Sequence, residues 1–178
     1  MGRVVLVTGG SRSGKSAFAQ NLAEQQPGAR AYLATCPLLD EEMRQRARNH
    51  REAREGRGWT TIEETSDLVQ ALRRAPPGTV LVECLTLWVN NLMYEAERSG
   101  REWGEADMSA RARAVLAACR DRKGTAVFVT NEVGWGIVPE NALARRFRDL
   151  SGRCNQTFAA EADEVWLVVC GQSLKLKG

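Results

Sequence analysis

The sequence predicts an α/β fold with an open, mostly parallel sheet that is flanked by helices. Short apolar, β-branched runs recur along the chain, and stretches of helical periodicity separate them. This alternation is typical of parallel strands joined by right-handed helical crossovers. A glycine-rich loop follows the first apolar run directly, and ligands in such folds bind beyond the carboxyl ends of the strands. A chain of 178 residues is large enough to bury one core, so we expect a single domain over residues 1–178.

The individual elements follow from local patterns taken in order along the chain. Apolar runs predict strands at 3–8, 30–34, 79–83, 125–130 and 164–170, with a further short extended piece at 59–63. Helical spacing of apolar residues predicts helices at 16–24, 40–54, 66–74, 85–97, 108–121 and 139–162. Asp40 and Ser66 are the expected N-caps of two helices, and Pro139 suits the first turn of the last one. Gly152 marks a point at which that last helix can break, and residues 98–105 form an expected surface loop.

Residues 9–16 read G-G-S-R-S-G-K-S and form a complete G-x-x-x-x-G-K-S phosphate-binding loop (P-loop). The glycines let successive backbone N–H groups turn toward phosphate oxygens, and the helix N-terminus adds partial positive charge. Lys15 is expected to reach the β- and γ-phosphates, and the Ser16 hydroxyl to ligate Mg²⁺. A glycine-rich turn that binds nothing is the alternative. The position of the loop, between a predicted strand and a predicted helix, favours a site for a nucleoside triphosphate.

Acidic and amide side chains follow two other predicted strands. Glu83 ends the apolar run 80–83, and in a P-loop fold a strand that ends in an acid usually faces Mg²⁺ directly or through water. An exposed acid at a strand end is the alternative for Glu83. Asn131 and Glu132 close the run 125–130 in the same way, and we expect them to line the same cleft.

His50 is the only histidine of the chain and shares one predicted helical face with Met43 and Ala47. A lone histidine is more often structural or exposed than catalytic. Arginines around it would lower its pKa and keep the imidazole nucleophilic, and they would stabilise charge on phosphate oxygens. A solvated helix with internal ion pairs explains the same arginines equally well: Arg44, Arg46, Arg48, Arg51, Arg54 and Arg57.

The composition excludes several classes of protein. A net charge of +3 is too mild to indicate nucleic acid binding. No apolar stretch approaches the roughly 18 residues of a membrane span, and we expect no signal peptide. The cysteines form no C-x-x-C pair and are odd in number, which argues against structural zinc and a disulfide framework. We therefore expect a cytoplasmic protein with five buried, inert thiols: Cys36, Cys84, Cys119, Cys154 and Cys170.

Motifs spread over nearly the whole chain carry a family resemblance. Besides the loop in residues 7–16, they lie at 40–43, 50–51, 59–63, 81–84, 130–140 and 165–169. The run T-N-E-V-G-W-G-I-V-P-E at 130–140 and the histidine segment are far more discriminating than the loop. With these motifs the chain resembles the bifunctional adenosylcobinamide kinase/adenosylcobinamide-phosphate guanylyltransferase family of cobalamin biosynthesis.

The resemblance implies a specific pair of reactions. Such enzymes phosphorylate adenosylcobinamide with ATP or GTP and then transfer GMP from GTP to the product, through a guanylylated histidine that matches His50. The family has a RecA-like fold and assembles as homotrimers. The family's catalytic and GTP-binding positions correspond here to His50, to Gly9, Gly10, Ser11, Arg12, Ser13, Gly14, Lys15 and Ser16 of the loop, and to Ala34, Thr35, Cys36, Arg51, Glu52, Ala53, Arg54, Glu63 and Glu83.

Two other functions use the same loop. A plain small-molecule or nucleotide kinase would need Lys15 and Glu83 equally, with His50 in a structural role. A RecA-like motor that binds nucleic acid is the third class, but the chain lacks a stripe of aromatic and basic residues. Because the loop cannot distinguish these functions, the histidine decides between them.

Overall fold

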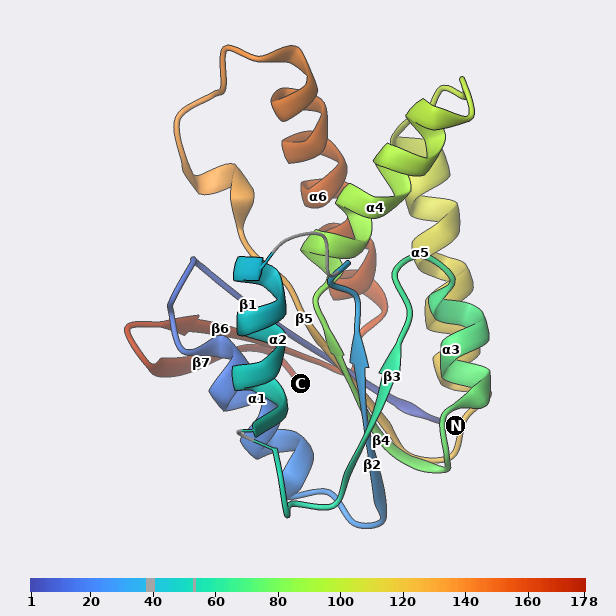
Figure 1. The fold of residues 1–178 in the computed structure, drawn as a ribbon, viewed down its shortest axis with the longest axis vertical. Coiled ribbons are helices and arrows are strands. Elements are labelled where there is room, and N and C mark those ends of the chain that lie inside the picture. The colour runs from blue at the N-terminus through green and yellow to red at the C-terminus, as the bar shows by residue number, and fades with distance from the viewer. Residues whose placement is uncertain (38–40, 53) are drawn as a thin grey trace.

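The computed structural model describes residues 1–37, 41–52 and 54–178, and seven strands of this part form one sheet (Figure 1). The strands are β1 (Arg3–Gly9), β2 (Ala29–Ala34), β3 (Trp59–Glu63), β4 (Gly78–Glu83), β5 (Thr125–Val129), β6 (Glu164–Val169) and β7 (Gln172–Lys177). Their order across the sheet is β3-β2-β4-β5-β1-β6-β7. Neighbouring strands are parallel except for β6 and β7, which are antiparallel. The strand before the P-loop therefore lies inside the sheet, between β5 and β6.

Helices cover both faces of this sheet. They are α1 (Lys15–Glu24), α2 (Glu41–Glu52), α3 (Leu68–Arg74), α4 (Leu85–Arg98), α5 (Glu105–Arg120) and α6 (Ala142–Glu161), with a short 3-10 turn η1 (Val133–Trp135). Side chains alternate across a strand, so Val4 and Leu6 pack with α3, α4, α5 and α6. Val5 and Val7 face the opposite way and pack with α1. Helix α1, which follows the P-loop, thus packs on one face of the sheet, and the larger core lies on the other face.

The larger core is anchored by aromatic side chains. Phe158 of α6 is fully buried, with its ring centroid 4.8 Å from that of Phe128 and 6.5 Å from that of Trp88. Burial of each such side chain stabilises the fold by roughly 1.5–3 kcal/mol. These contacts fix α4 and α6 against β5, the strand that leads into residues 130–132.

Strand β7 was not expected from the sequence. Its residues, Q-S-L-K-L-K, alternate polar and apolar side chains and are all exposed, which is the pattern of an edge strand protected by lysines. A tight turn joins it to β6, with positive φ at Cys170 and Gly171. The signal was the alternation of Leu174 and Leu176 with polar residues, but the run is short and only two of its six residues are apolar.

The starts of two helices differ from prediction. Asp67, rather than Ser66, caps α3, because its carboxylate accepts the N–H of Gln70 at 3.1 Å. Asn141, rather than Pro139, sets the start of α6, since its side chain accepts the N–H three residues on at 3.0 Å. In both cases the helix begins where a side chain can accept a backbone N–H of the first turn. The residue type that was used for the prediction, a serine before one helix and a proline before the other, did not decide the start. The expected cap Asp40 lies outside the described residues.

Helix α6 runs without a break through Ser151 and Gly152. Leu150, Cys154 and Phe158 follow at four-residue spacing and are all buried. Their packing holds one continuous helix, which outweighs the propensity penalty of about 1 kcal/mol for a glycine in a helix interior. Helix α5 also begins earlier than expected, at Glu105.

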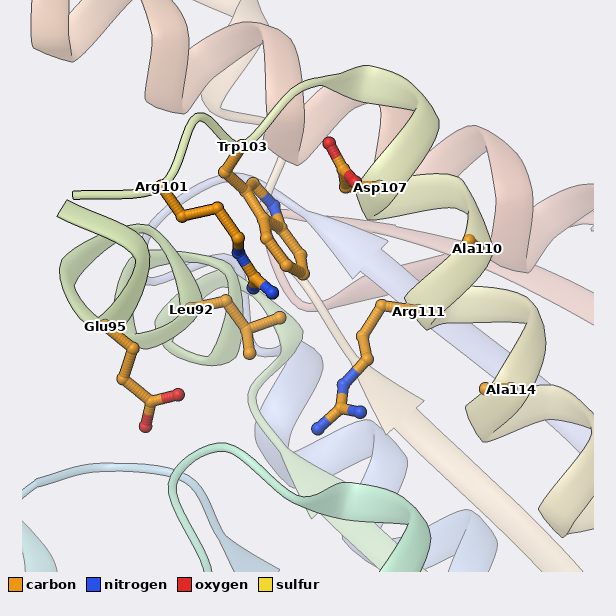
Figure 2. Close-up of a pocket in the computed structure, with 8 residues that line it drawn as sticks. All are labelled: Leu92, Glu95, Arg101, Trp103, Asp107, Ala110, Arg111 and Ala114. Atoms are coloured by element: carbon orange, nitrogen blue, oxygen red, sulfur yellow. The ribbon is translucent and has the colours of Figure 1, made fainter. Parts of the chain in front are cut away.

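The connection between α4 and α5 is not purely a surface loop, since Trp103 is only 7% exposed. Figure 2 shows Trp103 and Arg101 on one side of a cavity of about 530 Å³, with Arg111 on the opposite side. The Arg101 guanidinium lies 5.0 Å from the centroid of the Trp103 ring. The cavity is lined by residues of α4, α5 and their connection, and by none of the P-loop.

Two expectations from composition are tested by the structure. No helix in the described part of the chain is both long and apolar enough to span a membrane. No cysteine in the described part of the chain is in a disulfide, but only Cys119 and Cys154 are buried, while Cys170 in the β6–β7 turn is exposed. The expectation that every thiol is buried was therefore wrong. Burial raises the pKa of the Cys119 thiol to about 12, which keeps it protonated and unreactive.

Candidate nucleotide-binding site

The P-loop connects β1 to α1, and two of its glycines are required by the local geometry. A Cβ at Gly9 would lie 2.4 Å from the carbonyl oxygen of Val168, so no larger residue fits there. Gly14 caps α1 with φ near 94°, in the left-handed region, and a Cβ there would face Gly171 of the β6–β7 turn. Gly171 also donates its N–H to the carbonyl oxygen of Ser13 at 2.8 Å. The loop is thus fitted closely between β1 and the β6–β7 turn.

Lys15 lies at the start of α1 with its ammonium group directed back over the loop. Its Nζ donates a hydrogen bond to the carbonyl oxygen of Gly10 at 3.0 Å, and the residue is only 8% exposed. Burial lowers the pKa of Lys15, although Cys84 and Glu83 act in the opposite direction. A partly desolvated cation at a helix N-terminus attracts the phosphates of a nucleotide strongly.

Ser16 and Glu83 are far apart in sequence but in contact in the structure. The Ser16 hydroxyl donates a hydrogen bond to one carboxylate oxygen of Glu83, and Tyr32 donates to the other at 3.4 Å. Burial, and then the Glu83 charge, raise the pKa of Tyr32, so the phenol keeps its proton. Hydroxyl and carboxylate oxygens are suitable ligands for Mg²⁺, which prefers oxygen and binds through one or two carboxylates together with phosphates. Among the described residues, no three acidic, cysteine or histidine side chains cluster as in a preformed metal site.

Buried donors near the loop lack partners in the described part of the chain. They are the Ser13 hydroxyl and Nη1 of Arg54. The Arg54 guanidinium stacks 3.3 Å from the centroid of the Tyr32 ring, and the residue is only 5% exposed. An unsatisfied buried donor costs roughly 1–3 kcal/mol, and phosphate oxygens would satisfy both groups. The residues present therefore fit a bound triphosphate.

The segment after β2 is tied to the end of β4. The Thr35 hydroxyl donates to the Cys84 carbonyl at 2.8 Å and accepts the Cys84 N–H at 2.7 Å. Asn91 of α4 donates to the Thr35 carbonyl at 2.9 Å. Ala34 ends β2 opposite Glu83, and Cys36 is half-buried beyond it. The predicted contacts at 34–36 thus lie beside Glu83 at the carboxyl edge of the sheet.

The arginine-rich segment gives a second part of the site. Arg51 pairs with Glu63 at 3.0 Å, with both side chains exposed. A cavity of about 560 Å³ is lined by Arg48, Arg51, Glu52, Arg54, Glu55, Gly56, Gly58, Trp59 and Thr61. This arrangement brings together three of the predicted contacts in 51–54. The backbone of His50 belongs to α2, while its side chain and the whole of Ala53 lie outside the described part of the chain.

A polar network that the sequence did not predict lies after β5, between the P-loop and the end of β4. Glu132 accepts a hydrogen bond from the Thr8 hydroxyl at 2.5 Å and another from Asn155 at 3.1 Å. Asn155 in turn accepts from Thr130 at 2.7 Å. The expectation that Glu132 lies near the loop agrees with this geometry. No sequence pattern marks Asn155, which lies far away in the middle of α6.

The fold and the loop define the class of the protein as a P-loop nucleoside-triphosphate-binding protein with a RecA-like sheet, as the sequence predicted. The structure is similar to that of an ATPase of a type III secretion system of pathogenic bacteria, with a TM-score of 0.58 and 9% sequence identity. The match covers 98% of this chain, which spans 57% of that ATPase. At this identity the likeness concerns the fold alone.

Sequence comparison identifies the family. Residues 5–176 match the family described as cobinamide kinase/cobinamide phosphate guanyltransferase. The chain is 44% identical to the bifunctional adenosylcobalamin biosynthesis protein CobU of Salmonella typhimurium, over 98% of this chain and 99% of the relative. It is 42% identical to CobU of Escherichia coli (98% and 99%) and 38% identical to CobP of Pseudomonas aeruginosa (97% and 96%). The chain therefore belongs to the cobinamide kinase/cobinamide phosphate guanyltransferase family and is a bifunctional enzyme of that kind.

Proposed function

We propose that a single P-loop site serves both reactions of the family, with adenosylcobinamide as substrate, ATP or GTP as phosphoryl donor and GTP as guanylyl donor. The observation that carries this proposal is a chain of contacts between α2 and the loop. Arg54, just after α2, stacks on Tyr32, which donates to Glu83, which accepts from Ser16. The helix that bears the sole histidine is thus linked to the residues that face the phosphates.

The loop residues Gly9 to Ser16 bind the triphosphate in this proposal. Lys15 neutralises charge on the β- and γ-phosphates, and Arg54 donates its unpartnered N–H to a phosphate oxygen. Ser16 and Glu83 hold Mg²⁺ together with the phosphates. When bound, the ion stabilises negative charge on the phosphate oxygens and orients them. The remaining contacts with GTP come from residues 34–36, Arg51, Glu52, Ala53 and Glu63.

His50 acts as the nucleophile of the guanylyl transfer. A neutral ring nitrogen attacks the α-phosphorus of GTP, the bond from that phosphorus to the bridging oxygen breaks, and pyrophosphate leaves. The phosphate of adenosylcobinamide phosphate then attacks the same phosphorus. The phosphorus–nitrogen bond breaks, His50 is restored, and adenosylcobinamide-GDP is formed.

Labelling with GTP tests this assignment. Protein incubated with GTP labelled at the α-phosphate is expected to give an acid-labile, base-stable adduct, whereas label at the γ-phosphate is not retained. His50→Ala should abolish the adduct. Arg113→Ala is the matched control, because Arg113 is an exposed arginine of α5 that pairs with Glu161 and does not line the cavity beside α2. Normal labelling of His50→Ala would exclude His50 as the nucleophile, and an unchanged guanylyl transfer rate in that variant would leave His50 a structural role.

Assembly and location form the last part of the proposal. We expect a homotrimer in the cytoplasm, as the family resemblance implies. The lack of disulfides among the described cysteines agrees with a reducing compartment. Sedimentation equilibrium should give three times the mass of the 19.7 kDa chain, and a monomer at micromolar concentration would contradict the trimer.

A further inference from the structure

The proposed function leaves one carboxylate of the carboxyl edge without a role. Glu132 follows β5, which lies between β1 and β4 in the sheet. The P-loop follows β1, and Glu83 ends β4. Glu132 therefore leaves the sheet between the loop that binds the phosphates and the acid that supports the metal.

The backbone of Glu132 is fixed to the P-loop. Its N–H donates to the carbonyl oxygen of Gly9, the first loop residue, at 3.2 Å, and Thr130 donates its N–H to Val7 at 3.0 Å. These bonds continue the pairing of β5 with β1 beyond the end of β5. The main chain of Glu132 consequently has a fixed position next to the start of the loop.

One oxygen of the Glu132 carboxylate is held, and the other is open. Oε1 accepts from the Thr8 hydroxyl at 2.5 Å and from Nδ2 of Asn155 at 3.1 Å, whereas Oε2 has no hydrogen bond to any described residue. The side chain is half-buried. A carboxylate anchored through one oxygen presents the other in a defined direction, as a base must.

Buried residues behind Glu132 support this geometry. Asn155 is 8% exposed and Thr130 is 1% exposed. Thr130 donates to Asn155, which also donates to the carbonyl oxygen of Asn131 at 3.1 Å. The network thus holds the amide of Asn155 in the orientation that donates to Glu132. A surface acid with no role beyond solubility would not need three elements, β1, β5 and α6, to position it.

We propose that Glu132 is the catalytic base of the kinase reaction and orients the acceptor hydroxyl of the corrinoid toward the γ-phosphate. This inference rests on the proposed function, since it assigns the phosphoryl donor to the P-loop. In kinases, positioning of the acceptor hydroxyl by a carboxylate is the main contribution that the protein makes on the acceptor side. Glu83 is already in contact with Ser16 on the metal side, so the two acids divide the roles.

The step balances as a simple displacement. The acceptor hydroxyl oxygen of adenosylcobinamide forms a bond to the γ-phosphorus, and the bond from that phosphorus to the β–γ bridging oxygen breaks. The hydroxyl proton passes to Oε2 of Glu132, and the nucleoside diphosphate leaves. The guanylyl transfer needs no such base, because its acceptor is a phosphate that is already ionised at neutral pH. Glu132 should therefore matter to one of the two reactions only.

The variant Glu132→Gln tests this selectivity because it keeps an oxygen that accepts from Thr8 but cannot take a proton. The kinase kcat with adenosylcobinamide is expected to fall roughly 100-fold, within the range of general-base contributions. Guanylyl transfer to adenosylcobinamide phosphate, supplied ready-made, should stay within twofold. In Glu132→Ala, added formate should restore part of the kinase rate. Asp149→Asn, an exposed acid of α6, is the matched control and should change neither rate.

Three outcomes would overturn the inference. The first is a kinase rate of Glu132→Gln near that of the unmodified enzyme. The second is an equal loss of both reactions in that variant, accompanied by a lower Tm. The third is a folded Glu132→Ala variant whose kinase rate formate does not restore. Failure of this inference can be distinguished from failure of the proposed function. Labelling of His50 by GTP tests that function, and it is expected to remain normal in Glu132→Gln.

Discussion

The two parts of the nucleotide site differ in how they are built. At the carboxyl edge of the sheet, Lys15 bonds back onto its own loop, and Glu83 is held by hydrogen bonds from segments distant in sequence, among buried strands. The described side chains of α2 are exposed. The described contacts that join this part of the chain to the sheet include the Arg51–Glu63 ion pair and the packing of the buried Arg54 on Tyr32. The phosphate-binding part is therefore built into the core, while the histidine is carried on an outer element. This division suits the proposed use of one triphosphate site in two different reactions.

The largest expected effect belongs to the sheet edge. Lys15→Ala removes the cation over the loop and should lower kcat/KM of both reactions roughly 1,000-fold, since phosphoryl transfer depends mainly on electrostatic stabilisation of the phosphates. Separate kinase and guanylyl transfer assays check this. Lys123→Ala alters an exposed lysine far along the chain and should change neither. Survival of either reaction in Lys15→Ala would show that the two reactions do not share the loop.

A smaller effect is expected at the link between the two parts. Arg54→Met keeps a long side chain over Tyr32 but removes the unpartnered donor, so the Kd for GTP should rise about tenfold, or 1.4 kcal/mol. Equilibrium binding of a fluorescent GTP analogue measures it. The control is Arg57→Met in the same turn, because that arginine is exposed and pairs with Glu24 at 3.5 Å. Equal affinities of the two variants for the GTP analogue would show that Arg54 does not contact the phosphates.

The smallest effect concerns the outer attachment of α2. Arg51→Ala breaks an ion pair in which the two side chains are 63% and 60% exposed, and such pairs contribute only about 0–1 kcal/mol. The free energy of unfolding from urea titration should change by less than about 1 kcal/mol. A much greater loss would show that α2 is bound to the sheet more firmly than an exposed ion pair allows.

Sequence patterns predicted the central part of this fold well. The alternation of apolar runs and helices indicated β1, β2, β4, β5 and β6 within a residue or two, and the P-loop motif fixed one end of the site. The pattern at the edge strand β7 was less informative, because that strand is short and four of its six residues are polar. Helix starts were misplaced where an acceptor one or two residues away, at Asp67 or Asn141, made the better cap.

Contacts within the site were predictable only where a motif or a strand end marked them. Ser16 and Glu83 each follow such a signal, and their contact follows from the sheet order. Tyr32 and Asn155 carry no local signal, because one is an ordinary strand residue and the other a polar residue within a helix. Their roles come from the three-dimensional packing of β2 and α6, which no short stretch of sequence encodes.

The hairpin of β6 and β7 has a consequence for nucleotide binding at a distance from the phosphates themselves. Its turn supplies the N–H that holds the Ser13 carbonyl and closes around Gly14. The loop is therefore held in place by Gly171, so its shape depends on a hairpin whose outer strand is fully exposed. If this contact were lost, the backbone amides of the loop would no longer be held in position for the phosphates. The affinity for the triphosphate would then fall even though all catalytic side chains are unchanged.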